Sequence, residues 1–120
     1  MASVHKHLPS SIYKCKMNNP YIGGIPDVWY SGSKADLWVE YKFIPRNPTR
    51  GTVKFNLSEL QKHWLEQRQT EGRNVAIIVG CPAGGVLVSP PTYEVSVSTF
   101  NSLLQSRADL AAWIRQRTEG

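Results

Sequence analysis

Hydrophobic and polar residues alternate in the first part of the chain, which is the pattern expected of β-strands. Over residues 12–18, Lys14 and Lys16 fall on one face and the apolar side chains on the other, so a half-exposed strand is predicted. Apolar runs at residues 25–30 and 37–44 predict two further strands. Turn-forming and proline-containing segments follow these two runs, as is typical of antiparallel connections.

The period of the pattern changes from two to about 3.6 after residue 56. Ser58 followed by Gln61 is a capping-box signature, and Gly72 stands where a helix would end, so a helix is predicted between them. Residues 74–80 are almost continuously apolar, which predicts a strand buried on both faces. A Gly-rich turn then leads into residues 86–88, the predicted hairpin partner of that strand.

The remaining residues predict two helical stretches, one near residues 99–105 and one that begins at Ser106. The predicted order is βββαββα, an α/β fold with a mixed central sheet flanked by helices. A chain of 120 residues has the size of one domain, so we expect residues 1–120 to form a single unit.

The composition excludes several classes of protein. With 41% hydrophobic and 19% charged residues, the chain is neither disordered nor fibrous. It contains no apolar run of the ~20 residues that a membrane-spanning helix needs, and its first residues lack the apolar stretch of a secretory signal. Two cysteines are too few for a disulfide framework or a four-thiolate metal site. We therefore expect a cytoplasmic protein with reduced thiols.

The positive charge of the chain is confined to its first half. Residues 1–56 contain eight basic and three acidic residues, whereas residues 57–120 contain six of each. An uneven charge on a small domain favours a polyanionic partner such as nucleic acid, and an ordinary solvated surface is the alternative.

One group of residues has the composition of a hydrolytic metal site. Glu40 and Lys42 are two apart on a predicted strand and project from the same face, and Asp27 begins the neighbouring strand. A carboxylate and an ammonium group on a largely apolar strand are costly to bury without partners. Two carboxylates and a strand carbonyl would form an all-oxygen site suited to Mg²⁺ or Mn²⁺.

Pro26-Asp27, followed after twelve residues by Glu40-Tyr41-Lys42, resembles the motif of the PD-(D/E)XK nuclease superfamily. A glutamine, Gln61, on the helix after this strand also resembles the pattern of resolvase-like members. The similarity covers about residues 12–88 and is closest to small phage-encoded, VRR-NUC-like and Holliday-junction-resolvase-like proteins. It implies a restriction-endonuclease-like core.

The resemblance also implies roles for these residues. Asp27, Glu40 and the backbone carbonyl of Tyr41 would hold one or two Mg²⁺ ions, with Mn²⁺ as a substitute. Lys42 would orient water or offset developing charge, and Gln61 would hold Lys42 or a metal-bound water. Many family members carry an acidic residue before the first strand, and this chain has none before Asp27. Water, a partner subunit, or a histidine (His5 or His7) would replace it.

The predicted function is metal-dependent cleavage of DNA, selective for branched structures because 120 residues leave little room for a target-recognition domain. The alternatives are a homing or restriction-like enzyme and a non-catalytic nucleic-acid-binding module. Cutting two strands in step favours a homodimer or a higher even oligomer. The apolar residues of the C-terminal helices would cover either the sheet or a second copy. The candidate contacts to DNA phosphates are Lys14, Lys16, Lys34, Arg46, Arg50 and Lys54.

Overall fold

The computed structural model describes residues 1–17 and 23–120, and it contains the predicted elements within a larger set. In chain order these are α1 (Ala2–His5), β1 (Tyr13–Lys16), β2 (Val28–Ser31), β3 (Asp36–Phe43), β4 (Thr52–Lys54), α2 (Glu59–Thr70), β5 (Val75–Cys81), β6 (Gly84–Val88), β7 (Glu94–Ser96), α3 (Val97–Leu103) and α4 (Arg107–Glu119). Of the predicted strand at residues 12–18, residues 13–16 are observed as β1, and residue 18 lies outside the described residues. No helix in the described part of the chain is long and apolar enough to cross a membrane.

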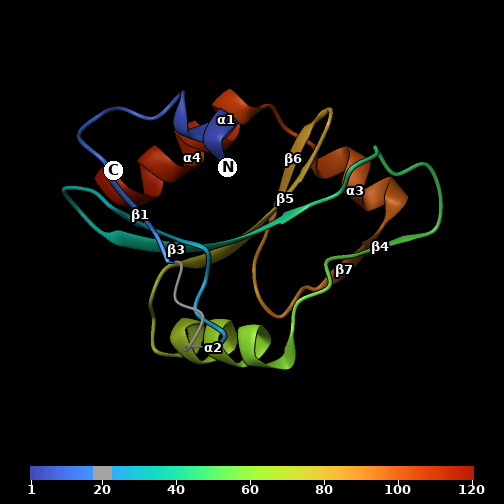
Figure 1. The fold of residues 1–120 in the computed structure, drawn as a ribbon, viewed down its shortest axis with the longest axis horizontal. Coiled ribbons are helices and arrows are strands. Elements are labelled where there is room, and N and C mark those ends of the chain that lie inside the picture. Colours follow the sequence, from blue (N-terminus) through green and yellow to red (C-terminus); the bar gives the residue numbers. More distant parts are fainter. Residues whose placement is uncertain (18–22) are drawn as a thin grey trace.

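Five strands form a mixed central sheet in the order β1-β2-β3-β5-β6 (Figure 1). Neighbouring strands are antiparallel except for β3 and β5, which run parallel with Glu40 opposite Ile77. The crossover between these two strands contains α2, as a parallel connection requires. The predicted α/β class and mixed sheet are therefore confirmed.

Helices cover both faces of the sheet (Figure 1). Leu65 of α2 packs with Ile77 and Val79 on one face, which we call the α2 face. Leu110 and Ile114 of α4 pack with the other face, the α4 face, which α1 also covers. Because β5 contributes to both clusters, it is buried on both sides, as its uninterrupted apolar sequence predicts.

The boundaries of α2 follow from its local sequence. The Ser58 side chain accepts a hydrogen bond from the Gln61 backbone, and the Gln61 side chain accepts one from the Ser58 backbone, so the predicted capping box is present. Gly72 has a φ of +83°, the left-handed conformation that ends many helices and that glycine adopts most easily. This start places Gln61 in the first turn of α2.

The predicted order βββαββα omits α1 and a second, two-stranded sheet of β4 and β7. Each of these strands has three residues, and Val53 pairs with Val95 from far along the chain. A strand this short has too few alternating residues for its period to be detected. Phe43 belongs to the apolar run at residues 37–44, which suggests a core position, but its side chain is 70% exposed.

Most apolar residues of the C-terminal helices pack within the chain, and among the large ones Leu103 is the exposed exception. Leu110 and Ile114 are buried on the α4 face, and Phe100 of α3 is buried in the cluster of the α2 face. Of the two uses that the sequence left open for these residues, covering the sheet is the one observed. This stripe therefore gives no support for a dimer.

Candidate active site

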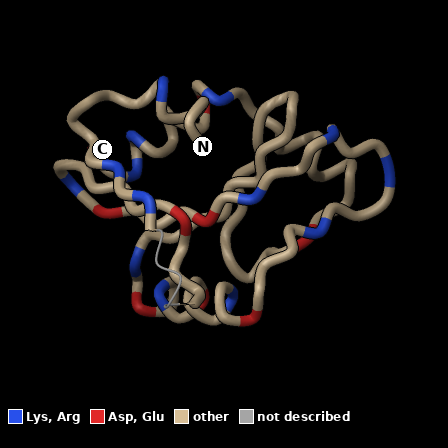
Figure 2. Tube along the Cα trace, in the orientation of Figure 1, with Lys and Arg blue, Asp and Glu red and all other residues tan. Residues whose placement is uncertain are grey.

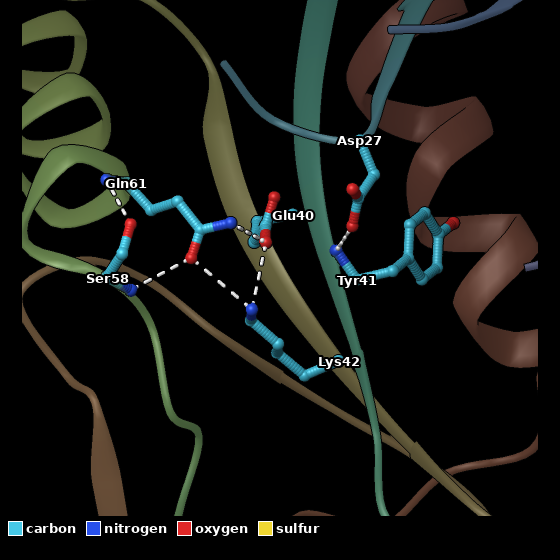
Figure 3. A network of polar contacts seen from close by, with 6 residues as sticks. All are labelled: Asp27, Glu40, Tyr41, Lys42, Ser58 and Gln61. Carbon is cyan, nitrogen blue, oxygen red and sulfur yellow. Dashed lines mark hydrogen bonds and ion pairs between the residues drawn. The ribbon is translucent and has the colours of Figure 1, made fainter. Parts of the chain in front are cut away.

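The side chains of Glu40, Lys42 and Gln61 form a closed network on the α2 face (Figure 3). Gln61 Nε2 donates to Glu40 Oε2 at 2.7 Å, and Lys42 Nζ donates to Gln61 Oε1 at 3.3 Å. Lys42 Nζ also lies 3.3 Å from Glu40 Oε2. Alternation along β3 puts Glu40 and Lys42 on the same face, and the first turn of α2 brings Gln61 to them. The three side chains therefore lie together as the sequence predicted.

The Asp27 side chain forms a hydrogen bond with the backbone of β3, on the side of β3 that faces β2. Its Oδ2 accepts a hydrogen bond from the Tyr41 N–H at 2.9 Å (Figure 3). The β2–β3 register pairs Val28 with Val39, so its continuation would place Pro26 opposite Tyr41. Proline has no N–H to donate to the Tyr41 carbonyl. The sequence Pro26-Asp27 thus ends the strand pairing and brings a carboxylate to the backbone of Tyr41.

Glu40 is a buried carboxylate with an unusual charge environment. Glu40 is only 1% exposed, so its carboxylate is buried. Burial raises the pKa of Glu40 to about 7, with a further increase from the negative charge of Asp27 and an opposing decrease from Lys42. Within the described residues, Glu40 Oε2 has two partners, whereas Oε1 is buried without a hydrogen-bond partner. A buried acceptor without a partner is costly and is a typical feature of a ligand site.

The chain resembles known proteins in its structure and not in its sequence. It matches no protein-family model, and no curated protein is similar to it in sequence. Its structure is similar to that of Hjc, a Holliday junction resolvase from the archaeal hyperthermophile Archaeoglobus fulgidus, with a TM-score of 0.61. The match covers 92% of each chain at 14% sequence identity. The chain therefore shares the fold of this resolvase, with a mixed central sheet flanked by helices. The restriction-endonuclease-like core predicted from the motif is thereby confirmed.

The donor atoms at this end of the nuclease fold suit a hard divalent cation. Glu40 Oε1 is unpartnered in the described part of the chain, and Asp27 supplies a second carboxylate. The Tyr41 carbonyl lies beyond the point where β3 pairs with β2, although Tyr41 still pairs with Ile78 of β5. Oxygen donors of this kind are the usual ligands of Mg²⁺. No cluster of three or more His, Cys, Asp or Glu side chains occurs among residues 1–17 and 23–120. Two carboxylates and one carbonyl are fewer ligands than a hard cation takes, so water or substrate oxygens would complete its coordination.

His5 is already engaged in a separate hydrogen-bonded chain. Its Nε2 lies 2.7 Å from the Tyr30 hydroxyl, which in turn contacts the Tyr41 hydroxyl. Burial lowers the pKa of His5 to about 4, with smaller decreases from nearby positive charges that include Lys14. The sequence suggested His5 as a replacement for the missing acidic ligand, but its Nε2 instead ties α1 to the sheet. The sequence predicts neither the His5–Tyr30 contact nor the Tyr30–Tyr41 contact, because each joins residues far apart in the chain.

The six predicted DNA-contacting residues do not form one patch. Figure 2 shows basic positions along β1 at one end of the molecule and along the β3–β4 connection and β4 at the other. Lys54 also lies opposite Glu94 in the β4–β7 register, which offsets its charge. Two groups result, one of Lys14, Lys16 and Lys34 and the other of Arg46, Arg50 and Lys54. All six are exposed.

The raised pKa of Glu40 predicts how stability depends on pH. The folded protein binds this proton more tightly than the unfolded chain, so the stabilisation is present below pH 4.5 and is lost as pH rises through about 7. In EDTA, the free energy of unfolding should fall by about 3 kcal/mol across this window relative to that of Glu40→Gln. Urea denaturation at a series of pH values measures this difference. Glu59→Gln, at an exposed carboxylate, is the control. Parallel curves for the wild type and Glu40→Gln would contradict the prediction.

Proposed function

We propose that the protein is a metal-dependent endonuclease that hydrolyses DNA phosphodiester bonds, with a preference for branched DNA. The main support is the buried Glu40 carboxylate, which has one oxygen held by Lys42 and Gln61 and the other without a partner in the described residues. A purely structural ion pair would be expected to satisfy both oxygens. The nuclease fold and the nearby Asp27 add independent support.

In this proposal Asp27, Glu40 and the Tyr41 carbonyl hold Mg²⁺, for which Mn²⁺ substitutes. The chemistry that such an ion would supply there is polarisation of the scissile phosphate and a lower pKa of water. The Lys42 ammonium lies beside Glu40, and the Lys42 side chain is 25% exposed, so it can reach the substrate. It orients the attacking water or offsets negative charge that develops on the phosphate.

Gln61 fixes the position of Lys42 relative to Glu40. Its Oε1 accepts hydrogen bonds from Lys42 Nζ and from the Ser58 N–H, and its Nε2 donates to Glu40. The amide is thus held at both ends, and its orientation is set by the helix cap. We propose that Gln61 is a positioning residue that acts through Lys42 and Glu40.

Cleavage of supercoiled plasmid tests the proposed activity. We expect nicked or linear products with Mg²⁺ or Mn²⁺ and none with EDTA. A non-catalytic nucleic-acid-binding module would bind the plasmid and leave it intact with either metal. A restriction-like or homing enzyme would give discrete fragments from long linear DNA, whereas a branch-selective enzyme would cut a four-way junction faster than a linear duplex of the same sequence.

We also propose that the active unit is a homodimer or a higher even oligomer. The proposed site of Asp27, Glu40 and the Tyr41 carbonyl occurs once per chain. Coordinated cutting of two strands needs two such sites, most simply related by a two-fold axis. Light scattering coupled to size exclusion measures the mass directly. A monomer with or without DNA, together with plasmid products that are only singly nicked, would contradict this proposal.

The basic residues of β1 should contribute to DNA affinity. Lys14 and Lys16 project from one side of the edge strand, and Lys16 is paired with Val28, next to Asp27. Replacing both with glutamine should reduce the slope of log affinity against log salt by about one unit per lost phosphate contact. The control is the same charge removal at Arg115 and Arg117 of α4. Equal slopes for the two double variants in fluorescence-anisotropy titrations would show that β1 has no special role.

A further inference from the structure

A cavity of about 380 Å³ lies beside the candidate metal site, against the α4 face. Its apolar wall includes Ile78 of β5 and Leu110 of α4, and Arg107 and Asp27 are among its polar residues. Tyr41 and Lys42 also line it, so it shares three residues with the proposed active site. The cavity lies at the carboxyl ends of the parallel strands β3 and β5, where α/β folds commonly bind ligands. A volume in this range suits a small flat molecule.

Phe43 lines the cavity and is the most exposed of the large hydrophobic side chains in the described residues, at 70%. It is the last residue of β3, and the next residue is anchored to β5 by the hydrogen bond from Ile44 N to Gly80 O at 2.8 Å. Gly80 is the strand partner of Phe43 and presents no side chain beside it. The ring is therefore held on a fixed backbone with open space next to it, which is the arrangement of a stacking surface.

The cavity also contains a positive charge that no carboxylate neutralises. Arg107 Nε donates to Ser3 Oγ at 3.0 Å, and Arg107 Nη2 donates to the Cys81 carbonyl at 3.2 Å. Both acceptors are neutral, and Arg107 forms no ion pair within the described residues. Lys42 and Asp27 also line the cavity, and the Lys42 ammonium is paired with Glu40, so the side-chain cation available to a ligand is Arg107. The charge of the cavity thus suits a segment of a polyanion.

We propose that this cavity receives an unstacked nucleobase of the DNA, adjacent to the scissile phosphate, and that Phe43 stacks on it. This inference rests on the proposed nuclease function and names the feature of the substrate that the site selects. The cavity and the proposed metal site share Asp27, Tyr41 and Lys42. A base in the cavity would therefore belong to a nucleotide next to the phosphate at the metal site. Removing a base from the stack costs least where it is unpaired, as at a branch point or bulge. Such DNA would therefore be preferred over a continuous duplex.

Two variants test the cavity from opposite directions. Phe43→Ala removes the stacking surface from an exposed position, so folding should be unaffected. Gly80→Leu fills the cavity, since a Cβ at Gly80 would meet Phe43 Cδ2 at an ordinary 3.5 Å and its backbone is not in the left-handed region. Leu103→Ala, at an exposed leucine of α3, is the matched control.

The probes are two oligonucleotide duplexes of one sequence, one fully paired and one with a single unpaired 2-aminopurine nucleotide. Affinities are measured in EDTA, so that no cleavage occurs. The wild type and Leu103→Ala should bind the bulged duplex about 10-fold more tightly, with a change in 2-aminopurine emission. Phe43→Ala and Gly80→Leu should reduce this ratio to about one and abolish the change in emission. Stacking on an aromatic side chain supports a preference of this size.

The inference is overturned if the wild type binds both duplexes equally, or if Phe43→Ala keeps the full preference and the full change in emission. Should Gly80→Leu not fold, Phe43→Ala decides the question alone. The outcomes also separate the two proposals. Metal-dependent cleavage, together with a preference for the bulged duplex that Phe43→Ala leaves unchanged, would support the nuclease proposal and refute the base pocket. A Phe43-dependent preference without any cleavage would support the pocket and refute the nuclease.

Discussion

Lys42→Ala should reduce metal-dependent cleavage of plasmid by at least ~100-fold. The Lys42 ammonium is the charged donor closest to Glu40 Oε2, at 3.3 Å, and no other lysine or arginine pairs with Glu40 in the described residues. A preorganised charge that acts on the developing charge of a transition state contributes on this scale. The measurement is the initial rate of plasmid cleavage at saturating Mg²⁺. A rate equal to that of the wild type would contradict the proposed mechanism.

Asp27→Asn and Glu40→Gln should cause losses of at least the same size, for a different reason. Each removes a charged oxygen ligand while it preserves the shape of the side chain, so metal affinity falls. Binding of DNA in EDTA should persist in both variants and can become tighter, because a negative charge near the phosphate is lost. Lys62→Ala is a matched control for the lysine, since Lys62 lies on α2 next to Gln61 and pairs with Glu59 instead of Glu40.

Gln61→Leu should reduce cleavage by about 10–100-fold, the range measured when residues that orient metal ligands are replaced. Leucine keeps most of the volume but cannot donate to Glu40 Oε2 or accept from Lys42 Nζ. Lys42 then loses a partner and Glu40 keeps only the ion pair. The pH dependence of the cleavage rate should shift with it, because the hydrogen bond to Glu40 influences its protonation.

Ser58→Ala separates this positioning role from a loss of helix stability. It removes the hydroxyl that caps α2 and leaves the Ser58 N–H free to donate to Gln61 Oε1. It should lower the free energy of unfolding by ~1 kcal/mol with near-normal cleavage and an unchanged pH profile. If Ser58→Ala and Gln61→Leu lose equal activity at matched stability, Gln61 acts only through the helix.

The sequence predicts the central elements because their signals are local. The apolar run of β5 and the capping box of α2 each depend on neighbours within a few residues. The alternation along β3 likewise predicts that Glu40 and Lys42 share a face. Gln61 was placed with them on the family resemblance, and the structure joins its side chain to both.

Long-range pairing accounts for what the sequence does not determine. The short strands β4 and β7 are stable only when paired with each other, and neither has enough residues to show a period. Phe43 has an apolar side chain in an apolar run, so its exposure could not be inferred. It follows from the absence of a side chain on Gly80 and from the cavity beside it.

The sequence by itself thus determined which residues are candidates for the proposed chemistry. Charged groups on apolar strands need partners, which singles out Asp27, Glu40 and Lys42, and the family resemblance adds Gln61. Only the tertiary structure decided how they are arranged. It buried Glu40, which raises its pKa, and it placed Asp27 on the Tyr41 backbone. It also formed the cavity from five separate parts of the chain, among them those around Asp27, Phe43 and Arg107. The physical reason is that burial and contact between distant segments depend on packing, which no local pattern of residues encodes.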